Sequence, residues 1–216
     1  MSRANSLILL CALTSLLVWG MELPFATILS FSATNFLSGR VWTALTTLFV
    51  HADLLHLLGN MLFLYVFGNT LERLASGSKM LAVFFTGGVV TNILSIPFYS
   101  PTAFLVGASA AIFTVTATVM LIKPLKFSWL FLLPVGLVAI LYFLFNILAV
   151  YRGSSGNVAY ISHIIGFLVG IPFGVAWSPN WMRNLVITLG LLAIFLVFIV
   201  FGVPIVINAV QKMLTS

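Results

Sequence analysis

Two short polar stretches interrupt an otherwise apolar chain: residues 107–110, with the sequence GASA, and residues 162–166, with the sequence SHIIG. They contain Ser109 and His163, each near the start of a long apolar segment. Lipid offers neither side chain a hydrogen-bond partner, so each needs a specific reason to be there. A hydroxyl becomes a useful nucleophile when a base removes its proton, and histidine, with an ordinary pKa of about 6.5, is the usual base. The two residues predict a serine–histidine catalytic pair inside the bilayer.

Attack on a peptide carbonyl also requires hydrogen-bond donors aimed at the oxyanion that develops. His56 and Asn60 are four residues apart, so they share one face of a helix. Their ring N–H and side-chain amide, with the backbone N–H of Ser109, supply the donors of an oxyanion hole. Gly107, two residues before the serine, allows backbone to approach closely at the top of the helix.

Small residues indicate how the histidine would reach the serine. Gly166, Gly170 and Gly174 recur every four residues, on the face that carries His163 within one turn. Such a stripe lets two helices pack backbone to backbone, which would bring His163 toward the segment of Ser109. No acid is placed to be a third catalytic member, because the three acids of the chain lie at the ends of segments: Glu22, Asp53 and Glu72. The prediction is a dyad whose imidazole is held by packing.

The composition places these residues in a membrane protein. Of 216 residues, 62% are hydrophobic and only 6% are charged, whereas a soluble domain has about 25% charged residues. The net charge of +6 does not indicate nucleic-acid binding, because the Lys and Arg residues are scattered at segment ends with no basic stripe. Cys11 is the single cysteine, so no intrachain disulfide is possible.

Seven apolar segments are long enough, or nearly so, to cross a membrane as helices. They are 6–22, 53–72, 79–97, 108–122, 127–149, 158–176 and 183–208. The first could pass for a signal peptide, but no convincing cleavage site follows it, so we interpret it as a retained helix. The stretch 22–52 is too polar and broken to span, and we expect it to lie along the outer surface as a partly embedded loop.

The charges favour one orientation of these segments. With the N-terminus inside, six cationic residues are cytoplasmic: Arg3, Arg73, Lys79, Lys123, Lys126 and Arg183. Three are outside: Arg40, Arg152 and Lys212. This bias predicts a cytoplasmic N-terminus and an external C-terminus. The segments of His56, Ser109 and His163 then all enter from the outer face, so their polar side chains converge at one level of the membrane.

The arrangement resembles the rhomboid family of intramembrane serine proteases. The matching residues are His51-x4-His56-x3-Asn60, Gly107-x-Ser109 and His163-x2-Gly166-x3-Gly170, in this order and on the second, fourth and sixth helices. The resemblance covers about residues 40–175. It implies an all-α polytopic membrane protein, with a six-helix rhomboid-like bundle at 1–178 and an additional C-terminal seventh transmembrane helix at 179–216.

The resemblance also implies roles. Ser109 would be the nucleophile and His163 the general base, while His56, Asn60 and the Ser109 amide would form the oxyanion hole. Substrates would be single-span membrane proteins, cut near their outer end where the helix unwinds, because an intact helix protects its own peptide bonds. Supporting positions are Gly107, Phe113, His51, Gly166 and Gly170. No cofactor, metal or nucleic acid is implied, and the lipid bilayer is the other partner.

The chain departs from the family pattern at several positions. Trp42 is followed by Thr43 where the family usually has arginine, so the loop-bracing role is absent or is filled by Arg40. Ala110 stands after the serine in place of the usual glycine, and Ser162 replaces the common alanine before the histidine. Phe113 takes the place of a tyrosine and could still stack on the histidine, but it cannot donate an O–H.

Other interpretations of the same residues stay open. Ser109 taken alone is typical of a helix cap or a small packing residue, and a single buried histidine of an interhelical hydrogen bond. His51 would cap a helix or steady the loop. Tyr142 and the Phe-rich segment 127–145 predict a lipid-facing or gate-forming surface, and Asn146 a satisfied interhelical polar group.

Three other functions are alternatives to the protease. A catalytically silent rhomboid-like protein would bind transmembrane clients, but such members typically lack the serine or the histidine. A small transporter would usually show internal repeats. A zinc site from His51, His56, His163 and Asp53 is disfavoured, because residues five apart on a helix point about 140° away from each other. The compact chain, with no targeting segment in this sequence, suggests a prokaryotic plasma membrane.

Overall fold

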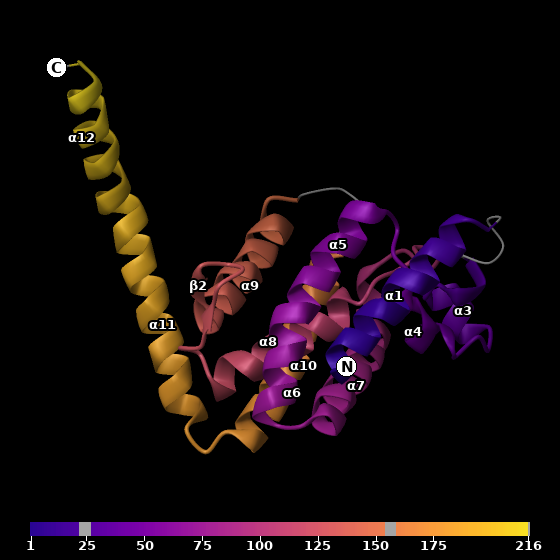
Figure 1. Cartoon of the computed structure of the whole chain (residues 1–216). Coiled ribbons are helices and arrows are strands. Elements are labelled where there is room, and N and C mark those ends of the chain that lie inside the picture. Colours follow the sequence, from indigo (N-terminus) through magenta and orange to yellow (C-terminus); the bar gives the residue numbers. More distant parts are fainter. Residues whose placement is uncertain (22–26, 154–158, 216) are drawn as a thin grey trace.

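The chain folds into a bundle of apolar helices (Figure 1). The computed structural model describes residues 1–21, 27–153 and 159–215. The helices of its first half are α1 (Arg3–Trp19), α3 (Ala33–Leu37), α4 (Thr43–Thr46), η1 (Thr47–Phe49), α5 (Leu54–Phe63), η2 (Leu64–Gly68), α6 (Asn69–Leu74), α7 (Gly77–Ser95) and η3 (Ile96–Phe98). Those of the second half are α8 (Ser109–Ile122), α9 (Val135–Tyr151), α10 (Tyr160–Trp177), α11 (Trp181–Val197), η4 (Phe198–Gly202) and α12 (Val203–Thr215).

Helix length and composition confirm the predicted fold class. In the part of the chain that the structure describes, four continuous helices are long and apolar enough to cross a membrane: Leu54–Leu74, Gly77–Phe98, Tyr160–Trp177 and Trp181–Ile205. Three shorter apolar helices, α1, α8 and α9, complete the set of seven. The protein is therefore an all-α, multi-pass integral membrane protein. The last helix, from α11 to α12, extends away from the bundle toward the C-terminus (Figure 1).

The start of the fifth predicted segment was wrong. We expected a helix from residue 127, but α9 begins at Val135. Residues 127–134 form a two-stranded antiparallel hairpin, in which β1 (Phe127–Ser128) pairs with β2 (Leu133–Pro134). The hairpin is as apolar as the helix that follows, so hydropathy does not separate the two. Pro134 lacks an N–H to donate within a helix and lies in the extended conformation just before α9.

Helix α8 is the centre of the bundle. Every residue from Ala110 to Leu121 is buried, and the helix packs against α7, α9, α10 and α11. Its 14 residues make it about 21 Å long at 1.5 Å per residue, shorter than the hydrocarbon thickness of about 30 Å. A short, enclosed helix can therefore begin below the level at which its neighbours end, and Ser109 is its first residue.

Glycines of α10 bring that helix directly onto α8. A Cβ at Gly166 would lie 2.5 Å from the carbonyl oxygen of Ala110, and one at Gly170 would collide with the carbonyl oxygen of Thr114. The hydroxyl of Thr114 donates to the carbonyl of Gly166 at 2.9 Å, and that of Thr118 to the carbonyl of Gly170 at 3.1 Å. Backbone contact and threonine hydrogen bonds together fix how far α10 can slide along α8.

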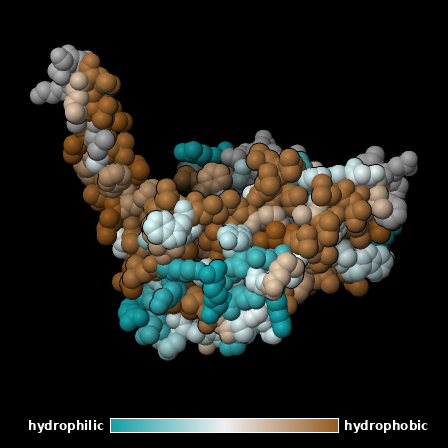
Figure 2. Space-filling view, viewed as in Figure 1, coloured by the Kyte–Doolittle hydropathy of each residue, from teal (hydrophilic) through white to brown (hydrophobic). Residues whose placement is uncertain are grey.

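Helix α1 anchors the end of the bundle that lies away from His56, Ser109 and His163. The carboxylate of Glu72 in α6 accepts the backbone N–H groups of Arg3 and Ala4, at 3.0 and 2.9 Å, so it caps the start of α1. The guanidinium of Arg3 donates to Ser78 of α7 at 3.0 Å. Figure 2 shows hydrophilic residues gathered at this end, below a largely hydrophobic surface.

Short helices occupy the segment that the sequence predicts as a non-spanning loop. Helices α3, α4 and η1 fill residues 33–49 and are tied to one another by loop hydrogen bonds. Arg40 donates to the side-chain oxygen of Asn35 at 3.2 Å, and its own carbonyl accepts the hydroxyl of Thr43 at 2.7 Å. Arg40 therefore braces this loop from within. Glu22 and most of the glycine-rich stretch 153–157 lie outside the described residues.

Candidate active site

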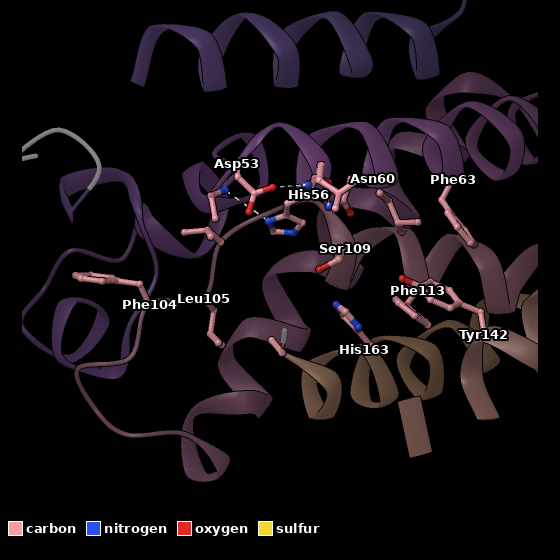
Figure 3. Close-up of a pocket in the computed structure, with 16 residues that line it drawn as sticks. Asp53, His56, Asn60, Phe63, Phe104, Leu105, Ser109, Phe113, Tyr142 and His163 are labelled. Carbon is pink, nitrogen blue, oxygen red and sulfur yellow. Dashed lines mark hydrogen bonds between the residues drawn. The ribbon is translucent and has the colours of Figure 1, made fainter. Parts of the chain in front are cut away.

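A cavity of about 330 Å³ opens where α5, α8, α9 and α10 meet. Figure 3 shows its lining, in which Ser109 and His163 face the same space from α8 and α10. His56 and Asn60 line it from α5. The four residues that the sequence singled out are thus brought together, although they are spread over more than 100 positions of the chain.

Ser109 is held by the loop that precedes it. As the first residue of α8 it has no intrahelical acceptor for its N–H, which leaves that group available to a ligand. The loop is fastened to the α3–η1 segment: Gly107 N–H donates to the Thr47 carbonyl at 3.0 Å, and Leu105 N–H to the Phe31 carbonyl at 2.8 Å. The Thr47 hydroxyl also bonds to the Leu105 carbonyl. The loop that leads into Ser109, the candidate nucleophile, is therefore held in place by three hydrogen bonds.

Gly107 is required for two independent reasons. Its φ is +106°, in the region that side chains rarely adopt. A Cβ there would also lie 2.8 Å from both Cε1 and Nε2 of His56. The imidazole of His56 therefore lies directly over the backbone just before Ser109.

Hydrogen bonds of the α5 start orient His56 and Asn60. Asp53 caps the helix by accepting the His56 N–H at 2.8 Å. The Ala52 N–H points at Nδ1 of His56, at 3.5 Å, so Nδ1 is an acceptor and Nε2 carries the proton toward the cavity. One proton of the Asn60 amide is used by the His56 carbonyl at 2.9 Å, which leaves the second available. Both side chains present a donor to the cavity.

His163 is buried, and its ring is held by a stacking contact and a hydrogen bond. Its ring stacks on Phe113 of α8, with centroids 4.6 Å apart and planes 14° apart. Its Nδ1 lies 2.7 Å from Oδ1 of Asn146 in α9. The preceding residue, Ser162, ties α10 through hydrogen bonds to Ser95, at the end of α7, and to Tyr99, which follows η3. Within the described chain, no hydrogen bond joins His163 to Ser109. Such bonds are often long before substrate binds.

His51 is a brace and lies outside any helix. It precedes α5, which starts at Leu54, so the helical spacing assumed for His51 and His56 was wrong: their rings are 5.2 Å apart at the centroids. Nδ1 of His51 pairs with the Ser15 hydroxyl at 3.0 Å, and Nε2 accepts the Ala108 N–H at 3.4 Å. His51 therefore links α1 to the residue before Ser109. Burial lowers the pKa of His51 to about 3, with His56 contributing in the same direction.

The structure specifies contacts of three residues that the sequence left open. Tyr142, for which the sequence predicts a lipid-facing or gate-forming surface, lines the cavity and stacks on Phe113 and Phe63, at 4.7 and 4.6 Å between centroids. Asn146 accepts a hydrogen bond from His163, which makes it the interhelical polar group that the sequence predicts and means that His163 is not held by packing alone. Nothing in the sequence indicated that Thr47 supports the site, because its bonds to Gly107 and Leu105 join loops that are far apart in the chain. Within the described ranges, no group of three or more His, Cys, Asp or Glu side chains could hold a metal.

Comparison with known proteins places this site in a family. A model of the rhomboid domain matches residues 38–180, which include every residue of the cavity. The chain belongs to the rhomboid family. Its rhomboid domain thus contains both the Gly107-x-Ser109 turn and the helix of His163.

Curated relatives share parts of this rhomboid domain. Rhomboid-like protease 3 of Toxoplasma gondii is 37% identical over 79 residues, covering 37% of this chain and 30% of that protein. Rhomboid-like protein 11, chloroplastic, of Arabidopsis thaliana is 29% identical over 138 residues, covering 58% and 49%. Rhomboid-like protease 1 of Toxoplasma gondii is 25% identical over 147 residues, covering 66% and 49%. The chain spans half or less of the length of these relatives.

Proposed function

We propose that this rhomboid protein is an intramembrane serine endopeptidase with Ser109 as nucleophile and His163 as general base. The observation that carries the proposal is the shared cavity. It places a serine at a helix start, a buried imidazole, and the donors His56 and Asn60 around one space. Membership of a family with relatives named as proteases supports the same activity.

The first half of the reaction forms an acyl-enzyme. The Ser109 oxygen attacks the scissile carbonyl carbon while Nε2 of His163 takes the hydroxyl proton. The carbonyl oxygen becomes an oxyanion, which accepts hydrogen bonds from the Ser109 N–H, the His56 Nε2–H and the Asn60 amide. Collapse breaks the C–N bond, and His163 returns its proton to the departing amine.

The second half regenerates the enzyme. A water molecule attacks the acyl carbon, with His163 as its base, and the Ser109 oxygen leaves with the proton that His163 gives back. The polar side chains of Asp53, His56 and Asn60, which lie among the apolar residues of the cavity wall, offer this water hydrogen-bond partners.

The substrates we propose are single-span membrane proteins, cut near the membrane face on which the cavity opens. A helical peptide bond is protected by its own hydrogen bonds, so a segment of substrate has to unwind to reach Ser109. Apolar and aromatic residues make up much of the cavity wall, among them Leu55, Phe63, Phe104, Ile112 and Tyr142. They suit apolar side chains of an unwound segment.

The charge distribution supports the orientation that we propose for the chain. Arg3, Arg73 and Lys79 lie at the end of the bundle away from the cavity, which would face the cytoplasm. The cavity would then open outward, in a prokaryotic plasma membrane. Reporter fusions at residue 77 and after residue 216 test this, since fluorescence of a cytoplasmic reporter at the C-terminus would overturn the orientation.

Labelling with a fluorophosphonate probe tests the catalytic pair without a known substrate. The purified protein in detergent should be labelled at Ser109, while Ser109→Ala and His163→Ala should lose labelling because one removes the nucleophile and the other its base. Cleavage of a single-span reporter in proteoliposomes should be lost in the same two variants.

Two controls make the labelling result decisive. Thermal unfolding should show that both variants keep the fold, and Asn184→Ala, far from the cavity, should label normally. A folded wild-type protein that neither labels nor cuts would overturn the proposal and favour a client-binding rhomboid-like protein. Full turnover in either dyad variant would contradict the assignment of that residue.

A further inference from the structure

Asn146 of α9 makes a buried hydrogen bond to the proposed base. It is fully buried, His163 is 5% exposed, and their Oδ1 and Nδ1 atoms are 2.7 Å apart. Asn146 does not line the cavity. The two residues come from different helices, α9 and α10, so the bond is a tertiary contact that neither helix supplies alone.

The orientation of the Asn146 amide is itself fixed. Its Nδ2 donates to the carbonyl oxygen of Tyr142, one turn earlier in α9, at 2.7 Å. The amide oxygen is therefore the atom that faces His163, and an oxygen can only accept. It follows that Nδ1 of His163 carries the proton, and that Nε2 carries the lone pair that a general base needs.

We infer that Asn146 is a positioning residue for His163: it selects the tautomer with a basic Nε2 and fixes the rotation of the ring toward Ser109. The stack on Phe113 complements this role, since stacking restrains the plane of the ring but leaves its rotation within that plane free. The hydrogen bond supplies the missing restraint. The inference deepens the proposed function and rests on it for its effect on catalysis, and the tautomer assignment stands apart from activity.

An amide suits this buried place better than a carboxylate. A carboxylate would have to be buried as a charge, and it would favour the protonated form of the imidazole, so that the resting ring would stay protonated, and unable to act as a base, up to a higher pH. Asn146 orients the ring with no charge. The other titratable side chains around the cavity are Asp53 and His56 from α5 and Tyr142 from α9, while α8 contributes the uncharged Ser109 and Phe113.

Kinetics of Asn146→Leu test the positioning role. Leucine keeps the branched shape of the side chain, with methyl groups in place of the amide oxygen and nitrogen, but it cannot accept a hydrogen bond from Nδ1. We expect kcat to fall about 10- to 100-fold. A positioned general base accelerates a reaction by about 10²–10⁴-fold, and the variant should lose part of this acceleration. KM should change little, because Asn146 does not touch the cavity. Asn184→Ala is the matched control: it removes another buried interhelical asparagine, which bonds the Leu121 carbonyl at 2.7 Å, and kcat should hold.

A second variant, Asn146→Asp, tests the charge argument while keeping the acceptor. The acidic limb of the pH–rate profile should move to higher pH, because the carboxylate favours the protonated ring and the base is then lost at higher pH. A profile identical to that of the wild type would contradict a direct contact between residue 146 and the base. This variant retains the hydrogen bond, so it guards against loss of fold in Asn146→Leu.

Nitrogen NMR of ¹⁵N-histidine-labelled protein reads the tautomer directly, and the chain has only three histidines to assign. The wild type should show His163 protonated at Nδ1, and Asn146→Leu should shift it toward a mixture, with His51 unchanged. An unshifted tautomer in Asn146→Leu, or an unchanged kcat, overturns the inference. Failure of the wild type to cleave would overturn the proposed function instead, and the NMR result would still decide the tautomer assignment.

Discussion

Hydrogen bonds around the three histidines determine which ring nitrogen of each carries the proton. His51 accepts the Ala108 N–H at Nε2, and His56 receives the Ala52 N–H at Nδ1. His163 faces an amide oxygen at Nδ1. The consequence is a division of labour at the cavity, where His56 presents a donor and His163 an acceptor. His56 could not become the acceptor, nor His163 the donor, unless the groups that face their Nδ1 atoms were changed.

Removal of the Asn60 amide should slow cleavage strongly. In Asn60→Ala one of the three proposed oxyanion donors is lost, and we expect kcat to fall by about 10²–10³. KM should move little, because the donor acts on charge that exists only in the transition state. Steady-state cleavage of a reporter in proteoliposomes measures both constants. A kcat within a factor of about two of wild type would remove Asn60 from the oxyanion hole.

His51 should make the fold sensitive to acid. Its pKa is about 3 in the folded protein and about 6.5 in the unfolded chain. Between these values the unfolded state binds the extra proton, so stability from this group is complete above about pH 6.5 and is lost as the pH falls toward 3. Thermal unfolding in detergent should show Tm falling from pH 7 to pH 5, and falling less in His51→Asn. If Tm fell by the same amount between pH 7 and pH 5 in the wild type and in His51→Asn, the proposed role of His51 would be contradicted.

At the scale of elements, the contact between α8 and α10 positions the proposed catalytic pair. Ser109 starts one helix and His163 lies in the first turn of the other, so a change in the spacing of the two helices changes the distance between these residues. The stripe from Gly166 to Gly174 removes side chains where the helices touch, and Thr114 and Thr118 hold the register. The precision of the site is thus a property of packing between two backbones.

A single methyl group in this contact should separate the helices. Gly166→Ala places a Cβ 2.5 Å from a backbone oxygen of α8, which cannot rotate away, and overpacking of this kind costs about 1–3 kcal/mol. We expect a lower Tm and weaker fluorophosphonate labelling. Gly190→Ala in α11 is the control, since nothing lies within 4 Å of its added Cβ and alanine is the better helix former. Equal effects from both variants would argue against the packing account.

Sequence patterns were sufficient for the parts of the fold that depend on local order. Hydropathy located the helices, and the spacing of His56, Asn60, Ser109 and His163 placed them at one level. Contacts between distant segments could not be predicted from these local patterns. The hairpin at 127–134 is as apolar as a helix, and Asn146 gives no sign of its partner because its meaning comes from the neighbouring α10.

At the scale of the whole molecule, we propose that residues 1–178 form the catalytic unit and that 179–216 add a separate helix. Among the described residues that follow His163, none lines the cavity. The start of α11 is nevertheless joined to the bundle, because Asn184 bonds the Leu121 and Ile122 carbonyls at the end of α8. Farther along, the helix from α11 to α12 is largely exposed and faces away from the other helices (Figure 1).

Deletion of residues 179–216 should therefore separate stability from chemistry. We expect a lower Tm, because the Asn184 contacts at the end of α8 are lost, together with labelling of Ser109 in the fraction that stays folded. Labelling normalised to folded protein by size-exclusion chromatography measures this. A well-folded truncated protein with no labelling would show that the seventh helix belongs to the catalytic unit.

The enclosure of α8 also has a consequence for biogenesis. A helix of this length is mismatched to the bilayer by itself, and it is shielded from lipid only when its neighbours surround it. The ribosome completes α8 before α9 and α10, so a nascent chain carries Ser109 for a time with neither its proposed base nor the asparagine that orients it. The protein would become able to cleave substrates only when α10 packs against α8, late in synthesis. Other nascent proteins leaving the same translocon would be protected from cleavage until then.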